Sequence, residues 1–340
     1  MRRSSFLTTL PLLVVPALAP LPSAAQSLPS KKEAAEILDK AGSRMVLARP
    51  GAPPFHLIAR LRYQIDKMSV DGTYEILWAS ASQYREEFRL GQLSATDVAL
   101  GDKLYILRNT PTLTYPQWRV RMLTGLPKRG DAPSNAPVAK VYASKDDPQH
   151  LVCARLDLPH EGVTKCFAKD TGELMSIQTK ADEISFSSVS DDFMEFGDVR
   201  YPRHVLSTMA DNILEVHLDK LAAVARFADE VFKPPEGSTA HDWCPQPETR
   251  NQQGEGFVSW LAKTGVIGPP SSGFDGFHGY YYYTEVAPDG RIERVAAISP
   301  DGSSKDLPTK TASDVRFPVL SCAGKSIEYE IISGVGTRGP

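Results

Sequence analysis

Hydrophobic and polar residues alternate along much of the chain between residues 55 and 218. In the clearest run, 55–65, Leu57 and Tyr63 belong to the apolar set and Arg60 to the polar one. Such an alternation is typical of a strand that buries one face. Turns such as Gly101-Asp102 separate the short strand-like segments, which predicts one antiparallel sheet of roughly ten strands. A sheet of that size must curl or close. The other segments of this kind are 74–78, 84–88, 98–100, 104–106, 151–156, 163–168, 174–179, 184–189, 193–196 and 213–218.

A helical pattern precedes these strands. Ser30 and Glu33 have the spacing of a capping box, which predicts a helix beginning after Ser30. Its apolar residues recur with helical period, and we expect them to face the core. They are Ala34, Ile37, Leu38, Ala41 and Met45.

The end of the chain has a different pattern. Segments 280–286 and 291–298 read as strands joined by a turn at Pro288-Asp289-Gly290, and Ser326–Ile332 reads as a last strand. A short helix is predicted over Pro308–Arg316. The fold class is therefore predicted as α+β: a large curled antiparallel sheet with an amino-terminal helix, then a small β-β-α-β domain.

The terminal segment resembles the carboxy-terminal domain of TonB-type energy transducers. The resemblance rests on Thr284–Val295, which contains a PDGR turn, on Val315–Pro318, and on Cys322–Tyr329. It implies a module that binds partner proteins by strand addition. The membrane anchor and proline-rich arm of a transducer are not recognisable, so we expect a TonB-like module at 279–335 and not a transducer.

The preceding region resembles the lipoprotein carriers of the LolA/LolB type, in which an incomplete barrel curls round a helix. The segments that carry this resemblance are Trp78 with Tyr84–Glu87, Leu100–Tyr105, Cys166–Leu174, Phe196–Pro202 and Phe232–Gly237. It implies a half-barrel over 26–237 whose concave face could hold an acyl chain. The alternative is that the inward residues simply fill a core.

Tyrosines and glutamates of the terminal segment are the candidate partner-binding residues. In the run Tyr280–Tyr283 alternate side chains face opposite ways, so one pair packs inside and the other is half-exposed. We assign Tyr281 and Tyr283 to partner contact, because tyrosine is enriched at interfaces. Glu328 and Glu330 lie on the polar face of the last strand, where they serve partner binding or protect a sheet edge.

The first 25 residues have the order of a secretory signal peptide. Arg2 and Arg3 precede the apolar stretch 6–21, and small residues end at Ala25. We expect cleavage there and a soluble periplasmic or secreted protein; the general and twin-arginine routes both stay open. Two arginines leave with the leader, which changes the formal net charge from −3 to −5. This mildly acidic chain has no basic run, which argues against nucleic acid as a partner.

The remaining length predicts two domains, at 26–237 and 279–335, joined by a glycine- and proline-rich linker at 238–278. Four cysteines in an exported chain predict disulfides. Cys153 and Cys166 lie symmetrically about the Pro159–His160 bond of a hairpin, so they would face each other within bridging distance. Cys244 and Cys322 then pair by elimination. The alternative is zinc, with ligands drawn from His150, Cys153, His160 and Cys166, or from His241 and Cys244.

Enzyme signatures are not found in the sequence. His160-Glu161 begins like a zinc-protease helix, but Thr164 occupies the place of the second histidine. His204, His217 and His278 stand alone, and we interpret them as ordinary surface or core residues. The sequence thus predicts no catalytic residue, no cofactor and no resident metal. It favours a non-enzymatic binding protein for a lipid, an acyl group or a lipoprotein, with an envelope-protein partner. The alternative is a scaffold whose sheets are packed shut and which contacts only proteins.

Overall fold

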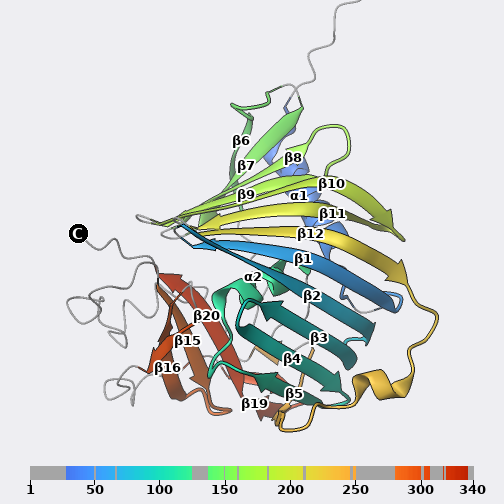
Figure 1. Cartoon of the computed structure of the whole chain (residues 1–340). Helices are drawn as coiled ribbons and strands as arrows, with labels where there is room; N and C mark the ends of the chain where they lie inside the picture. The colour runs from blue at the N-terminus through green and yellow to red at the C-terminus, as the bar shows by residue number, and fades with distance from the viewer. Residues whose placement is uncertain are drawn as a thin grey trace, which may run out of the picture.

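A thirteen-stranded antiparallel sheet dominates the structure, a computed structural model (Figure 1). The structure describes residues 28–49, 51–65, 67–124, 137–148, 150–158, 161–181, 184–209, 212–245, 248–249, 280–299, 302–306, 317 and 319–335. The strand order in the large sheet is β13-β5-β4-β3-β2-β1-β12-β11-β10-β9-β8-β7-β6. The strands are β1 (Phe55–Ile65), β2 (Met68–Ser80), β3 (Gln83–Leu90), β4 (Leu93–Leu100), β5 (Lys103–Arg108), β6 (Val138–Ala143), β7 (Leu151–Leu158), β8 (Glu161–Ala168), β9 (Leu174–Ala181), β10 (Ile184–Phe196), β11 (Val199–Met209), β12 (Asn212–Ala223) and β13 (Thr239–Asp242).

The sheet is larger than the sequence predicted, because β6, β11 and β13 were not predicted as strands. Strand β6 forms one edge, and β13 extends the other edge by pairing with β5. The segments 184–189 and 193–196, predicted separately, form the single strand β10. Strand β13 lies at the start of the segment expected to be a linker. Strand β13 forms because its backbone pairs with that of β5. A four-residue polar run has no alternation of apolar residues that would predict such a strand from the sequence.

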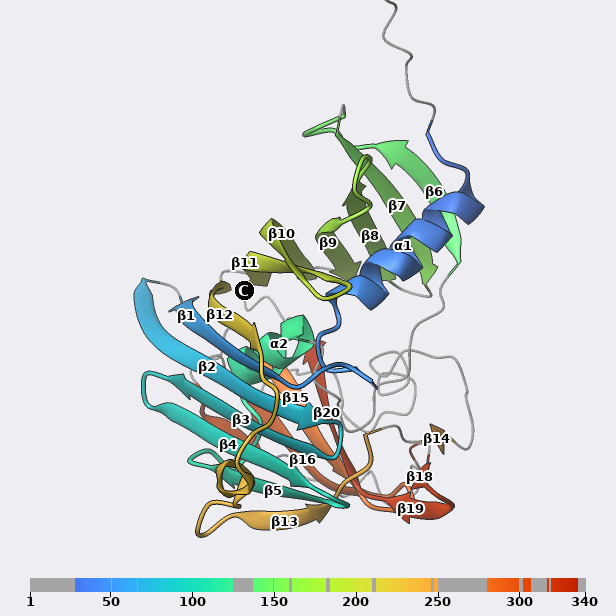
Figure 2. The same cartoon turned by 90° about the vertical axis from the view of Figure 1, so that its right-hand side faces the viewer.

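Two helices cover the same face of the sheet. Helix α1 (Lys31–Met45) lies across β6–β9, and α2 (Tyr115–Thr124) lies under β1–β3 (Figure 2). Residues that are directly opposed on paired strands lie on the same face of the sheet. Ile177 is opposed to Ser188, Ser188 to Ser207, and Ser207 to Leu214, so these four residues mark one face from β9 to β12. Helix α2 was not expected, because no element was predicted for residues 107–125. A 3-10 turn, η1 (Asp229–Phe232), precedes β13.

Helix α1 begins where its sequence predicts. Ser30 Oγ accepts a hydrogen bond from Glu33 N–H at 3.2 Å, and Glu33 Oε2 accepts one from Ser30 N–H at 2.7 Å. This reciprocal capping box satisfies two amide groups at the helix start. Ala34, Leu38 and Ala41 are buried, as the apolar stripe predicted.

Two small sheets follow at the end of the chain. One has the order β17-β16-β15-β20 and the other β14-β18-β19. The first is made of β15 (Tyr280–Val286), β16 (Ile292–Ile298), β17 (Ser304–Asp306) and β20 (Tyr329–Val335), and the second of β14 (Glu248–Thr249), β18 (Leu320–Cys322) and β19 (Lys325–Ile327).

The predicted last strand, Ser326–Ile332, is wrong as a single element. It divides at Glu328: Ile327 in β19 pairs with Leu320, whereas Tyr329 in β20 pairs with Val286 of the other sheet. The alternation of apolar residues continues through the division, because Ile327 and Tyr329 are buried in the same cluster. The pattern therefore recorded which face is buried but not which strand is the partner. The helix predicted over 308–316 lies outside the described residues.

The turn between β15 and β16 needs glycine. Gly290 has φ of 82°, a conformation that side chains disfavour, and a Cβ there would meet the carbonyl of Phe317. Phe317 N–H in turn donates to the Gly290 carbonyl at 2.7 Å. The PDG turn thus holds the segment that leads into β18.

Candidate functional site

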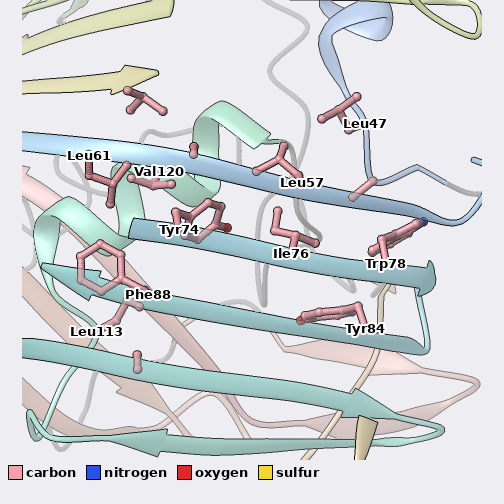
Figure 3. Packing of buried hydrophobic residues seen from close by; sticks show 14 of the residues in the cluster. Leu47, Leu57, Leu61, Tyr74, Ile76, Trp78, Tyr84, Phe88, Leu113 and Val120 are labelled. Atoms are coloured by element: carbon pink, nitrogen blue, oxygen red, sulfur yellow. The ribbon is translucent and has the colours of Figure 1, made fainter. Parts of the chain in front are cut away.

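The inner face of β1–β5 is closed. Tyr74 and Phe88 pack with Leu113 and with Val120 of α2, and all are buried (Figure 3). The four-stranded terminal sheet covers the same core through Tyr283 and other residues (Figure 2). The other members brought by the later part of the chain are Trp243, Ile298 and Ile332. Side chains therefore fill the space where the half-barrel prediction placed a ligand.

A buried network of charges joins the two sheets. Arg121 Nε of α2 donates to both carboxylate oxygens of Glu86, at 2.8 and 2.5 Å, and Arg121 also pairs with Asp97. Arg108 lies 3.3 Å from Asp97 and 3.5 Å from Glu330 of β20. Glu86 and Asp97 are almost fully buried. Because a buried charge that loses its partner is costly, this network ties α2 and β20 to β3–β5.

The electrostatics of the network follow from burial and from pairing. Burial raises the pKa of Glu86, an effect that the nearby Arg121 opposes. Burial alone would lower the pKa of Arg121, but Asp97 and Glu86 hold it well above its ordinary value. Burial, reinforced by Glu330 and Glu285, raises the pKa of Tyr283. At neutral pH the arginines are therefore charged, and Tyr283 keeps its proton.

The residues assigned to partner contact occupy different environments. Tyr283 was expected to be half-exposed, and this is wrong: only 2 % of its surface is accessible, because its face of β15 packs on the large sheet. The side chain of Tyr281 lies outside the described part. Glu330 pairs with Arg108, and Glu328 lies 2.8 Å from His241 Nδ1. Their role in partner binding stays a prediction.

The other half of the sheet has a smaller core and a groove. Ala34, Leu38 and Ala41 of α1 pack on β7, β8 and β9. Beside α1 lies a groove of about 630 Å³, open to solvent on one side. Its lining consists of Leu28, Pro29, Glu33, Glu36, Ile37, Lys40, Val152, Phe167 and Lys169. This volume is within the range of small-molecule sites.

The groove combines an apolar floor with a charged rim. Val152 and Phe167 face each other on β7 and β8 at its base, where each is only 1 % exposed, so the apolar surface open to a ligand comes from Ile37 of α1 and from Leu28. Leu28 at the mouth is 46 % exposed. Glu36 and Lys169 are among the charged groups of the lining. Such a surface can take an apolar chain and leave a polar head in water.

A disulfide braces the floor of the groove from behind. Both disulfides expected from the sequence are present, Cys153–Cys166 and Cys244–Cys322, so their sulfurs are not thiolate ligands for zinc. Cys153 and Cys166 form the cross-strand pair next to Val152 and Phe167, on the opposite face. The bridge therefore holds together the two strands that form the floor. Cys244–Cys322 connects the end of β13 to the terminal sheets.

The sequence analysis missed the groove, although it named one of its residues. Ile37 was interpreted as a core residue of the α1 stripe, whereas the structure leaves it partly exposed beside Val152 and Phe167. The apolar stripe of α1 is wider than the surface that the sheet covers, so Ile37 and Met45 at its margins are only partly buried. A stripe this wide is the feature of the sequence that could have predicted an exposed apolar surface beside α1.

Within the described residues neither helix is long and apolar enough to cross a bilayer. No protein-family model and no curated protein matches the sequence.

Solved structures resemble the fold. A LolA superfamily protein from Nitrosomonas europaea is 13 % identical, with a TM-score of 0.40 over 59 % of this chain and 97 % of that one. A putative outer membrane lipoprotein-sorting protein domain from Vibrio parahaemolyticus is 8 % identical, with a TM-score of 0.31 over 60 % of this chain and 97 % of that one. The MucA/MucB complex structure from Pseudomonas aeruginosa matches at 12 % identity and a TM-score of 0.29, over 89 % of this chain and 94 % of that one. The chain is thus similar to LolA-type and MucB-type structures, and scores this low transfer no function to it.

Proposed function

We propose that this chain is a non-enzymatic binding protein of the cell envelope, and that it holds the apolar chain of a lipid or of a lipoprotein in the groove beside α1. The groove, with apolar surface from Leu28 and Ile37 above the buried pair Val152 and Phe167, is the observation that carries the proposal. Two disulfides support an oxidising compartment such as the periplasm. The leader predicted at 1–25 lies outside the described residues.

The chemistry of the groove fits an amphipathic chain. Each methylene group moved from water to an apolar surface contributes about 0.8 kcal/mol, so a few contacts give useful affinity. The opening to solvent lets a headgroup stay hydrated near Lys40 and Lys169. Because α1 forms one wall, a small displacement of this helix would lengthen the site without disturbing the closed core of β1–β5.

A second candidate function, a scaffold that contacts only proteins, is favoured by the closed inner face of β1–β5. Strand β20 is at one edge of the four-stranded sheet, and β6 is at one edge of the large sheet. Backbone groups at such edges can pair with an added strand. In that case the TonB-like module would act as a fixed docking edge, since Glu330 ties it to Arg108.

Titration with a fluorescent fatty acid separates the two candidates. We expect saturable binding by the purified protein, and about tenfold weaker binding by Leu28→Glu, because loss of a leucine contact costs at least about 1.4 kcal/mol. Leu100→Glu is the matched control: Leu100 is 41 % exposed, close to the 46 % of Leu28, but lies on β4. Circular dichroism establishes that all three proteins are folded.

The outcomes are distinct. Weaker binding by Leu28→Glu alone supports the groove. Equal loss in both variants, or no binding by the unaltered protein, overturns the lipid proposal and leaves the scaffold.

A further inference from the structure

Two histidines that look isolated in the sequence face each other on the outer surface of the large sheet. His204 of β11 and His217 of β12 are directly opposed across the strand pair. Their rings stack, with centroids 4.5 Å apart and planes inclined by 20°. The expectation that they stand alone is therefore wrong. The two histidines are 13 residues apart and lie symmetrically about the 210–211 connection, just as Cys153 and Cys166 are 13 residues apart and lie symmetrically about the Pro159–His160 bond. The sequence alone therefore contained the signal for this pair.

One carboxylate lies close to both rings. Glu215 shares a face of β12 with His217, because the two residues are two apart on the strand. Its Oε1 lies 2.9 Å from Nε2 of His217 and 3.3 Å from Nε2 of His204. One ligand-type atom from each of these residues lies within 4.8 Å of the others. Three such groups, from two neighbouring strands, therefore lie close together.

The hydrogen bonds of His204 leave one nitrogen without a partner. Its Nδ1 lies 2.9 Å from Oδ1 of Asp191, on the next strand, β10. Since a carboxylate only accepts, Nδ1 must donate, and in the neutral ring Nε2 then carries a lone pair. That Nε2 is buried and has no hydrogen-bond partner among the described residues. A lone pair that faces a carboxylate oxygen is repelled by it, and either a proton on Nε2 or a metal cation relieves this repulsion.

The spacing fits a tetrahedral metal ion. With bonds of about 2.0–2.1 Å, two ligand atoms on a tetrahedral centre are about 3.3 Å apart. Glu215 Oε1 to His204 Nε2 already has this distance, and the contact with His217 needs to open by a few tenths of an ångström. Because the two rings stack, one of them must also turn so that both Nε2 lone pairs point at the ion. Asp191 occupies the place of the carboxylate that orients a metal-bound histidine through its second nitrogen.

We propose that His204, His217 and Glu215 form a binding site for a divalent transition-metal ion of the zinc class. Imidazole and carboxylate ligands suit this class, and three protein ligands leave the fourth position open to water or to a partner's side chain. Binding requires the His217 tautomer with its proton on Nδ1. The site is independent of the proposed lipid groove, which lies on the opposite face of the sheet.

The surroundings admit a cation. The His204 side chain is 26 % exposed and that of His217 is 43 % exposed, so an ion can enter from solvent. Arg60, the β1 neighbour of His217, donates to both oxygens of Asp219, at 2.8 and 2.9 Å. Arg203 pairs with Asp192. Arg62, which is opposed to Glu215 on β1, lies 3.2 Å from Asp71. Each of these three arginines therefore has a carboxylate partner.

Isothermal titration of the purified, chelator-treated protein with zinc sulfate tests the site. We expect one strong equivalent per chain, lost in both His204→Gln and His217→Gln. Asp191→Asn should bind about 10- to 100-fold more weakly, because an orienting carboxylate has an effect of that size. His56→Gln is the matched control: His56 lies on the neighbouring strand β1, opposed to Ala222 of β12, and pairs with Glu75 at 2.6 Å.

A second readout separates ligation from folding. Nitrogen-15 spectra of the histidine rings should show that zinc shifts the Nε2 signals of His204 and His217 and leaves His56 unchanged. Retention of the strong equivalent in both histidine variants would overturn the proposal, as would zinc-induced shifts confined to other histidines or the absence of binding by the unaltered protein.

Discussion

The two halves of the large sheet carry the same kind of strand but bury it differently. On β1–β5 the inner face is covered by α2 and by the terminal sheet, and the charges of Glu86, Asp97, Arg108 and Arg121 are enclosed between them. On β6–β9 only α1 lies over the sheet, and a groove of about 630 Å³ stays open beside it. Whether the inner face of the sheet is closed to a ligand thus depends on how many helices and sheets cover it, and not on the strands that form it.

Because of this difference, we expect the closed half to contribute most of the stability and the open half to contribute the binding site. The closed half holds most of the large aromatic side chains, including Trp78, Tyr84 and Phe88. The open half holds few, and a disulfide connects its floor strands. A cross-link of this kind stabilises a region that has too little apolar burial of its own. The groove can then remain open without unfolding β7 and β8.

The largest effect is expected from Arg121→Met in the closed half. The substitution leaves Glu86 and Asp97 buried with too little positive charge, which should lower the free energy of unfolding by about 3–5 kcal/mol. Urea unfolding measures it. The matched control, Arg60→Met, breaks an exposed pair on the outer face and should cost no more than about 1 kcal/mol. Equal costs would contradict the assignment of the network to the closed half.

Removal of the Cys153–Cys166 bridge tests the open half. The double change Cys153→Ala and Cys166→Ala frees a segment with a sequence separation of 13, for which chain entropy predicts a loss of about 3 kcal/mol. Hydrogen exchange should quicken on β7 and β8 and stay slow on β2–β4. If exchange quickens equally in both halves, the two halves unfold as one unit and the comparison fails.

Gly290→Ala should have an intermediate effect at the boundary between the small sheets. The positive φ and the nearby Phe317 carbonyl predict a loss of about 1–3 kcal/mol. Gly237→Ala also has a positive φ, of 80°, but meets no atom, so it should cost less. Thermal unfolding of the two variants measures the contribution of the close contact. If the two variants unfold at the same temperature, the positive φ alone accounts for the loss of stability, and the close contact of Gly290 with Phe317 contributes nothing.

The smallest effect concerns pH. Asp242 of β13 accepts hydrogen bonds from Lys103 and Lys325, which lower its pKa to about 2. A depressed carboxylate pKa stabilises the fold above its unfolded value of about 3.9, and this stability is lost as pH falls from about 4 to 2. The group is partly exposed, so we expect less than about 1 kcal/mol. Asp242→Asn should remove that part of the pH dependence of urea unfolding; an unchanged slope would contradict it.

Much of the fold was predictable because face alternation and capping are local. The register of β7 and β8, and with it the Cys153–Cys166 pair, followed from symmetry about a hairpin. The division at Glu328 and the addition of β13 to the sheet depend on partners distant in sequence, so local patterns did not reveal them. The burial of Tyr283 likewise depends on the large sheet that covers its face of β15.

The candidate sites were less predictable than the fold. Ile37 belongs to the same helical repeat of apolar residues as its buried neighbours on α1. It lines the groove only because β7 and β8 do not extend far enough to cover it. His204 and His217 have the symmetry of the cysteine pair, but the sequence analysis applied that argument to sulfur alone. Asp191 comes from a third strand, so its contact with His204 needs the complete register.

The most direct test of the account is photo-crosslinking with a fatty acid that carries a diazirine on its chain, followed by peptide mapping. The account predicts adducts on α1 and on β7–β8, reduced by unlabelled fatty acid and by Leu28→Glu. Adducts on β1–β5 or α2 would contradict it, because they would require the closed half of the sheet to hold the ligand.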